Sequence, residues 1–211
     1  MKANNNFIYF FTLYVLSFSE TVFFKQLLGV DRLIYESYIQ QLTTEQIKDL
    51  CSLNNLWSLI SYIAMPVILL IKIYIIASIL DIGLFLFSQK TSFSQLLNIV
   101  LKAEFIFLVP MLVKFIWFYF FQSNYTLADL ENFAPFSLMT FWNYKEIEPW
   151  YIYPLRTINI FELIYCIILI FLLSKSFNIP KRKSFIIVIC SYGLGLFFWI
   201  LVIMFLALNI N

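Results

Sequence analysis

The sequence predicts an all-α membrane protein: a polytopic helical bundle of about five transmembrane helices, with further amphipathic helices lying at the membrane interface. Of its 211 residues, 62% are hydrophobic and only 12% are charged, so the chain has more apolar surface than one soluble core of this size buries. The apolar residues gather into runs of about 18 or more, the length that crosses a bilayer. Counts of four or six spans are the alternatives.

The N-terminal part combines one apolar run with a mixed-charge segment. Residues 7–24 form the first predicted span, and because no small-x-small cleavage site follows, we expect a span rather than a cleaved signal peptide. Residues 25–55 place apolar side chains at helical spacing on a half-polar surface, which predicts helices lying at the outer interface. Thr43 and Gln46 form a capping box that predicts the start of a second, short helix there. We therefore treat residues 1–55 as a first span followed by an external amphipathic loop.

The remaining residues, 56–211, predict a four-helix transmembrane region. Residues 93–102 form an amphipathic helix that leads into one of these spans. Prolines, acidic residues and aromatic residues between 122 and 156 predict an irregular external segment. The predicted crossings of this region lie at about 57–80, 103–121, 157–174 and 185–208.

Cations gather where the predicted topology puts the cytoplasmic side. The segment KSFNIPKRKS contains no acidic residue and carries the basic anchor of the chain, Lys175, Lys181, Arg182 and Lys183. Short loops rich in Lys and Arg stay in the cytoplasm, so we expect a cytoplasmic N-terminus and a periplasmic C-terminus. The anchor is too short and isolated to predict a nucleic-acid partner. Contact with anionic lipid headgroups is its second expected role.

Several ionisable residues fall at membrane depth, where charge is expensive and each such residue is a candidate functional group. Residue counting puts Lys114 and Glu162 at similar depths near the outer surface, and we expect them to pair. Lys72, Asp81 and Glu104 form a second group toward the cytoplasmic half. The two interpretations are a proton or ion relay and an ion pair that fixes helix register, and we favour the structural one.

Small residues in the last span predict close helix packing. Ser191, Gly193 and Gly195 place a small-residue stripe on one helix, which lets a neighbouring backbone approach. We favour a contact within the bundle over a dimer interface. Pro66 and Pro110 fall at similar depths in neighbouring spans and predict bends, or else a hinge.

The composition argues against an enzyme. The chain contains no histidine and three cysteines that are too far apart for a CxxC pair, which removes the commonest metal ligand and general base. No glycine-rich phosphate loop or nucleophile elbow is present. We therefore predict no catalytic residues, no metal and no cofactor.

Two stretches resemble the Yip1 domain family of small five-span membrane proteins. They are KTSFSQLLNIVLKAEFIFLVPMLVKF and APFSLMTFWNYKEIEPWYIYPLRTINIFELIYCIILIFLLSKSFNIPKRKSFIIVICSYGLGLFF, within roughly residues 90–205. The resemblance implies an amphipathic entry helix, a proline-containing span and a basic loop before the last span. Eukaryotic members of the family associate with Rab-type GTPases at Golgi and endoplasmic reticulum membranes, and the family supplies no catalytic residues.

These features together predict a non-enzymatic scaffold or accessory subunit of a bacterial envelope protein complex. A bias toward Asn, Lys, Ile and Phe is typical of AT-rich bacterial genomes, so we expect the bacterial inner membrane. The expected partners are the lipid bilayer and other membrane or envelope proteins. The alternative is a small transporter or permease component, which the charges at membrane depth would favour.

Overall fold

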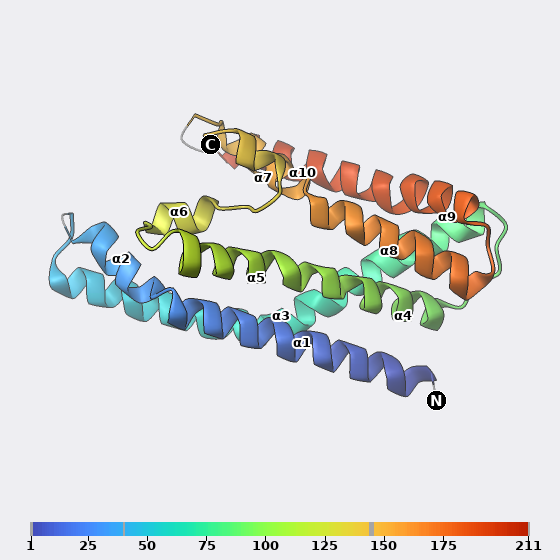
Figure 1. The fold of residues 1–211 in the computed structure, drawn as a ribbon, viewed down its shortest axis with the longest axis horizontal. Helices are drawn as coiled ribbons and strands as arrows, with labels where there is room; N and C mark the ends of the chain where they lie inside the picture. The colour runs from blue at the N-terminus through green and yellow to red at the C-terminus, as the bar shows by residue number, and fades with distance from the viewer. Residues whose placement is uncertain (1, 40, 144–145, 211) are drawn as a thin grey trace.

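The protein folds into a bundle of helices that run alternately in opposite directions (Figure 1). The computed structural model describes residues 2–39, 41–143 and 146–210. Across these ranges no strand forms, and five helices are long and apolar enough to cross a membrane. The predicted all-α bundle is therefore confirmed.

The five long helical segments alternate with shorter helices. The long ones are α1 (Lys2–Leu27), α3 (Thr44–Leu86), α4 (Phe93–Glu104) continuing into α5 (Val109–Ile116), α8 (Ile160–Phe177), and α9 (Lys181–Val188) continuing into α10 (Leu194–Ile210). The short helices are α2 (Val30–Tyr38), α6 (Leu127–Asn132) and α7 (Pro149–Thr157). Irregular turns interrupt two of the long segments: the 3-10 turn Phe105–Leu108 joins α4 to α5, and the π-helical turn Ile189–Gly193 joins α9 to α10. A further π-helical turn, Trp117–Phe121, follows α5.

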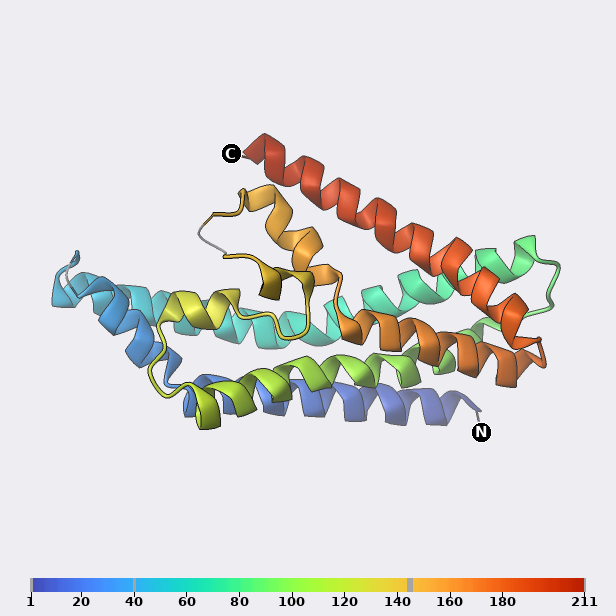
Figure 2. The ribbon, with the colours of Figure 1, turned by 45° about the horizontal axis from the view of Figure 1, so that its top comes forward.

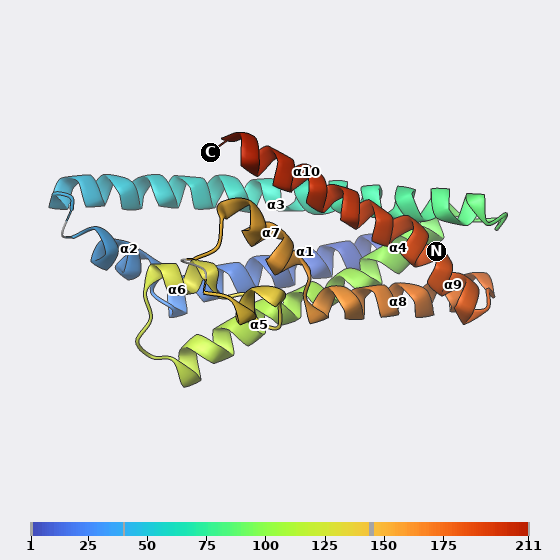
Figure 3. The ribbon, with the colours of Figure 1, turned by 90° about the horizontal axis from the view of Figure 1, so that it is seen from above.

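The two ends of the bundle differ in character. The chain begins at one end, which also holds the loops at residues 87–92 and 178–180, and we call it the basic end (Figures 1 and 3). The other end holds α2 and α6, with α7 nearby, and we call it the distal end. An arrangement with five crossings puts the basic anchor and the start of α1 on the same side, as the sequence predicts.

The main core lies where α3, α4, α8 and α9 meet. Most of its fully buried side chains are aliphatic, and they include Leu80, Leu96, Leu169, Leu173 and Ile187. A second, smaller core at the distal end joins α1, α2 and α6 to the end of α5, through Leu28, Leu33, Phe118 and Leu130. Both ends of the bundle therefore have a packed core, and Leu33 anchors α2 in the smaller one.

Helix α3 differs from the prediction. The capping box is present: the backbone N–H of Gln46 donates to the Thr43 hydroxyl oxygen, and the backbone N–H of Thr43 donates to the Gln46 side-chain oxygen. However, the helix that begins there runs unbroken for 43 residues through Pro66, where a short interfacial helix and a separate span were expected. No glycine or proline lies between residues 44 and 65 to end it, and a proline can be accommodated within a membrane helix.

The basic anchor also lies differently from the prediction. Lys175 is in the last turn of α8, where a cation is favoured by the helix dipole. Lys181, Arg182 and Lys183 form the first turn of α9 rather than a loop. The true loop is short, because Asn178 adopts a left-handed conformation that ends α8. Cations are disfavoured at a helix N-terminus, so helix stability does not account for these three residues.

Candidate intramembrane polar site

A polar cluster lies inside the bundle, and an ion pair is at its centre. Lys72 of α3 approaches Glu104 at the end of α4, with 2.7 Å between Lys72 Nζ and Glu104 Oε2. The Glu104 side chain is only 2% exposed, whereas that of Lys72 is 43% exposed. Lys72 Nζ also lies 4.1 Å from the centre of the Phe107 ring. The buried carboxylate therefore takes its counter-charge from the neighbouring helix.

Two tyrosines extend the cluster from Glu104 to a second carboxylate. Tyr165 of α8 is completely buried. The centre of its ring lies 5.0 Å from the centre of the Phe107 ring and 5.2 Å from that of Tyr192. The Tyr192 hydroxyl donates a hydrogen bond to the Glu162 carboxylate. Glu162 and Tyr165 are three residues apart, so they share one face of α8. Residues from four helical segments thus form one continuous polar cluster.

The helix irregularities coincide with this cluster. Glu104 directly precedes the 3-10 turn Phe105–Leu108, and Tyr192 lies within the π-helical turn Ile189–Gly193. Such turns are frequent at functional sites, because they redirect side chains. Two buried polar atoms of the cluster also have unused hydrogen-bonding capacity. Glu104 Oε1 and the Tyr165 hydroxyl are buried without a hydrogen-bond partner among the described residues, although the two groups interact electrostatically.

The structure brings together some of the predicted charges and separates others. Lys72 and Glu104 pair, as their predicted grouping suggests. Asp81 lies apart from them, and it accepts a hydrogen bond of 2.6 Å from the Thr91 hydroxyl, which closes the loop at the basic end. The expected pair of Lys114 and Glu162 was wrong. Lys114 lies 5.3 Å from the centre of the Phe24 ring, while Glu162 faces Tyr192.

The small-residue stripe packs within the bundle, as favoured from the sequence. Ser191 is buried against Gly83 of α3. Gly195 faces Ile79 of the same helix, whereas the atoms nearest to a Cβ on Gly193 belong to Ile189 and Val188 of its own helical segment. Two of the three predicted residues therefore form the contact between α3 and the last long segment.

Tyr165 and Tyr192 were not predicted as site residues from the sequence. Both lie in apolar runs and therefore resemble ordinary core or interface aromatics. The available signal was the phenol group, because a buried tyrosine hydroxyl requires a hydrogen-bond partner. Tyr165 is also one helical turn from Glu162, and this spacing alone places the two groups on the same face of a helix.

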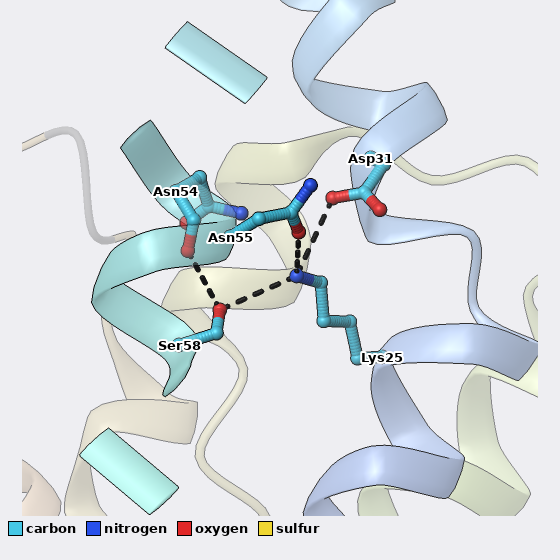
Figure 4. A network of polar contacts seen from close by, with 5 residues as sticks. All are labelled: Lys25, Asp31, Asn54, Asn55 and Ser58. Carbon is cyan, nitrogen blue, oxygen red and sulfur yellow. Dashed lines mark hydrogen bonds and ion pairs between the residues drawn. The ribbon is translucent and has the colours of Figure 1, made fainter. Parts of the chain in front are cut away.

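A second polar contact fixes the distal end. The Lys25 ammonium group lies 2.6 Å from Asn55 Oδ1, 3.3 Å from Ser58 Oγ and 3.6 Å from Asp31 Oδ1 (Figure 4). Nearby, Tyr125 donates a hydrogen bond to the Leu28 carbonyl, and burial raises the pKa of Tyr125. These contacts join α1, α2 and α3, so the short helix α2 has a defined place.

The described residues contain no group of three or more potential ligands that could hold a metal ion. No protein-family model matches the chain, and no curated protein or solved structure matches it either. The resemblance to the Yip1 domain family therefore stays a prediction from the sequence.

Proposed function

We propose that the protein is a non-enzymatic scaffold or accessory subunit of a protein complex in the bacterial inner membrane. Its contact surface would be the distal hairpin, which we define as residues 30–56: helix α2 and the first part of α3. The observation that carries the proposal is the length of α3, since this helix is too long to be contained in a bilayer.

The length of α3 can be compared directly with the membrane. Its 43 residues rise about 64 Å at 1.5 Å per residue. A bilayer is about 30 Å thick in its hydrocarbon core and about 45 Å with its headgroups. Even at a tilt of about 40°, the upper end of the usual range, the helix would rise about 49 Å. The polar start of α3, rather than its apolar remainder, is the part that would extend beyond the membrane.

The distal hairpin exposes apolar side chains on this projecting part. Ile39 is 52% exposed and Leu53 is 50% exposed, and the hairpin has further exposed apolar residues, namely Tyr35, Tyr38, Leu50 and Leu56. Outside the hydrocarbon core, such side chains are available for contact with a partner protein. The Lys25 contacts and the Thr43 capping box hold the hairpin in place, so a partner would meet a preformed surface.

Site-specific photo-crosslinking in cells tests the proposal. A photoreactive amino acid at Leu53 or Ile39 is expected to yield discrete protein adducts. The matched control is Val202, an apolar residue of α10 that is 50% exposed and would face lipid. Adducts from the hairpin alone support a scaffold. Lipid adducts alone at all three positions would count against it.

A second proposal, a small transporter or permease component, is favoured by the polar cluster between Glu104 and Glu162. Two carboxylates and two phenols lie in one cluster, in which Tyr192 is hydrogen-bonded to Glu162, and such intramembrane groups are candidates for a proton path. Proton uptake into proteoliposomes that is abolished by Glu104→Gln and Glu162→Gln in folded protein would support this function. No uptake by the unaltered chain would rule out a proton relay.

A further inference from the structure

We infer that the distal end carries a binding site for the phosphate headgroup of an anionic lipid. A cavity of about 300 Å³ lies between α5, the start of α8 and the segment at residues 133–137. Its wall includes two cations, Lys114 and Arg156, and is otherwise mainly apolar, with Phe107, Met111 and Phe161. This size is at the small end of ligand sites. The site lies at the opposite end of the bundle from the basic anchor.

Neither cation is neutralised by a carboxylate. Among the described residues, neither Lys114 nor Arg156 takes part in an ion pair. Lys114 Nζ lies over the Phe24 ring in a cation–π contact. Glu131 attracts Lys114 electrostatically, and Arg156 repels it. Among the described residues that line the cavity, two are cations and none is a carboxylate, which leaves an excess positive charge that an anion would neutralise.

Arg156 is fixed in place but has unused donor capacity. Its Nη2 atom donates to the Glu131 carbonyl at 2.9 Å and to the Asn132 side chain at 2.8 Å. Its Nε atom is buried and has no hydrogen-bond partner in the part of the chain that the structure describes. A buried donor of this kind is costly unless a ligand or water satisfies it. A planar guanidinium beside a lysine is well suited to a phosphate group.

The cavity is also structurally supported. Two backbone hydrogen bonds tie its covering segment to the start of α8: Leu138 donates to the Ile158 carbonyl, and Ile160 donates to the Phe136 carbonyl, both at 3.0 Å. The remaining wall is mainly apolar, and part of it comes from a candidate membrane span. This combination favours an amphiphile over a free anion, because acyl chains can pack on the apolar wall while the headgroup meets the cations.

Lipid titration of the purified full-length chain in neutral detergent tests the inference. The probes are short-chain phosphatidylglycerol, phosphatidylcholine of the same chain length and inorganic phosphate. The readouts are the thermal unfolding midpoint and bound lipid by native mass spectrometry. We expect phosphatidylglycerol to bind the unaltered chain, and Lys114→Met to weaken that binding about tenfold.

Two further variants separate this site from general effects. Lys114→Arg retains the charge and can also donate hydrogen bonds to a phosphate group, so it is expected to bind within about threefold of the unaltered chain. Lys102→Met removes a cation of the same continuous helical segment that also lies over an aromatic ring, and it is expected to leave binding unchanged. Equal binding by Lys114→Met in folded protein would overturn the site. Equal binding of phosphatidylcholine, or an equal effect of inorganic phosphate, would overturn the assignment to an anionic lipid.

Discussion

Replacing Lys72 with Met is expected to lower the free energy of unfolding by about 3 kcal/mol. The substitution leaves Glu104 buried in the bundle without its cation, and Glu104 Oε1 already lacks a hydrogen-bond partner among the described residues. The double variant Lys72→Met with Glu104→Leu is expected to recover most of the loss, since two apolar side chains can replace a buried ion pair. The measurement is reversible unfolding in detergent by titration with sodium dodecyl sulfate.

Lys102→Met is the matched control for this prediction. Lys102 also lies over an aromatic ring, with 5.1 Å from its Nζ to the centre of the Tyr9 ring, but no ion pair involving it is found in the described residues. Its loss is expected to change the unfolding free energy by less than about 1 kcal/mol. If the double variant is as unstable as Lys72→Met alone, the ion pair is not the source of the effect.

Substituting Gly83 with Ala is expected to destabilise the protein by about 1–3 kcal/mol. A Cβ atom at this position would lie 2.6 Å from Ser191 Cβ and 2.9 Å from Ser191 Oγ, so α3 and the last long segment would have to separate. Ser191→Gly removes both obstructing atoms. The double variant Gly83→Ala with Ser191→Gly is therefore expected to be more stable than Gly83→Ala alone.

Gly193→Ala separates this clash from the loss of a glycine. A Cβ atom on Gly193 would meet its nearest neighbours at 3.8–3.9 Å, which is ordinary contact. We expect this variant to be neutral or more stable by up to about 1 kcal/mol, because alanine favours the helix. Thermal unfolding of the unaltered chain, Gly83→Ala, Gly83→Ala with Ser191→Gly, and Gly193→Ala checks both expectations. A Gly83→Ala variant as stable as the unaltered chain would show that α3 and Ser191 are not in close contact.

Periodicity, composition and local capping were enough to predict the helical class and the start of α3. Each of these signals depends on residues close together in sequence. The Thr43 capping box is an example, because both partners lie within one turn. The end of that helix was not predicted, since polar residues such as Asn54 and Asn55 are as compatible with a solvated helix as with a loop.

The arrangement of the charges was predictable only in part. Counting residues along a span gives depth but not the direction in which a side chain points. For this reason Lys114 and Glu162 were expected to pair, although Lys114 turns toward Phe24 and Glu162 toward Tyr192. The irregular turns beside Glu104 and at Tyr192 change that direction further, and an apolar sequence carries little local signal for them.

We propose that the distal hairpin lies outside the cytoplasm, where it can meet a partner protein. Figure 2 shows the hairpin extending past the rest of the bundle at the end opposite the start of the chain. Cys51 lies in the hairpin and is partly exposed, so it can report on this position directly. Cys166 and Cys190 lie in the candidate spans and can be replaced by Ser to leave one thiol.

Labelling of Cys51 in intact cells with a membrane-impermeant maleimide is the most direct test. Ser176 lies at the basic end, and Ser176→Cys in a chain without the other cysteines is the matched control. We expect Cys51 to be labelled in intact cells and the Ser176→Cys thiol to be labelled only after the inner membrane is permeabilised. Protection of Cys51 until permeabilisation, with labelling of the control in intact cells, would contradict the account.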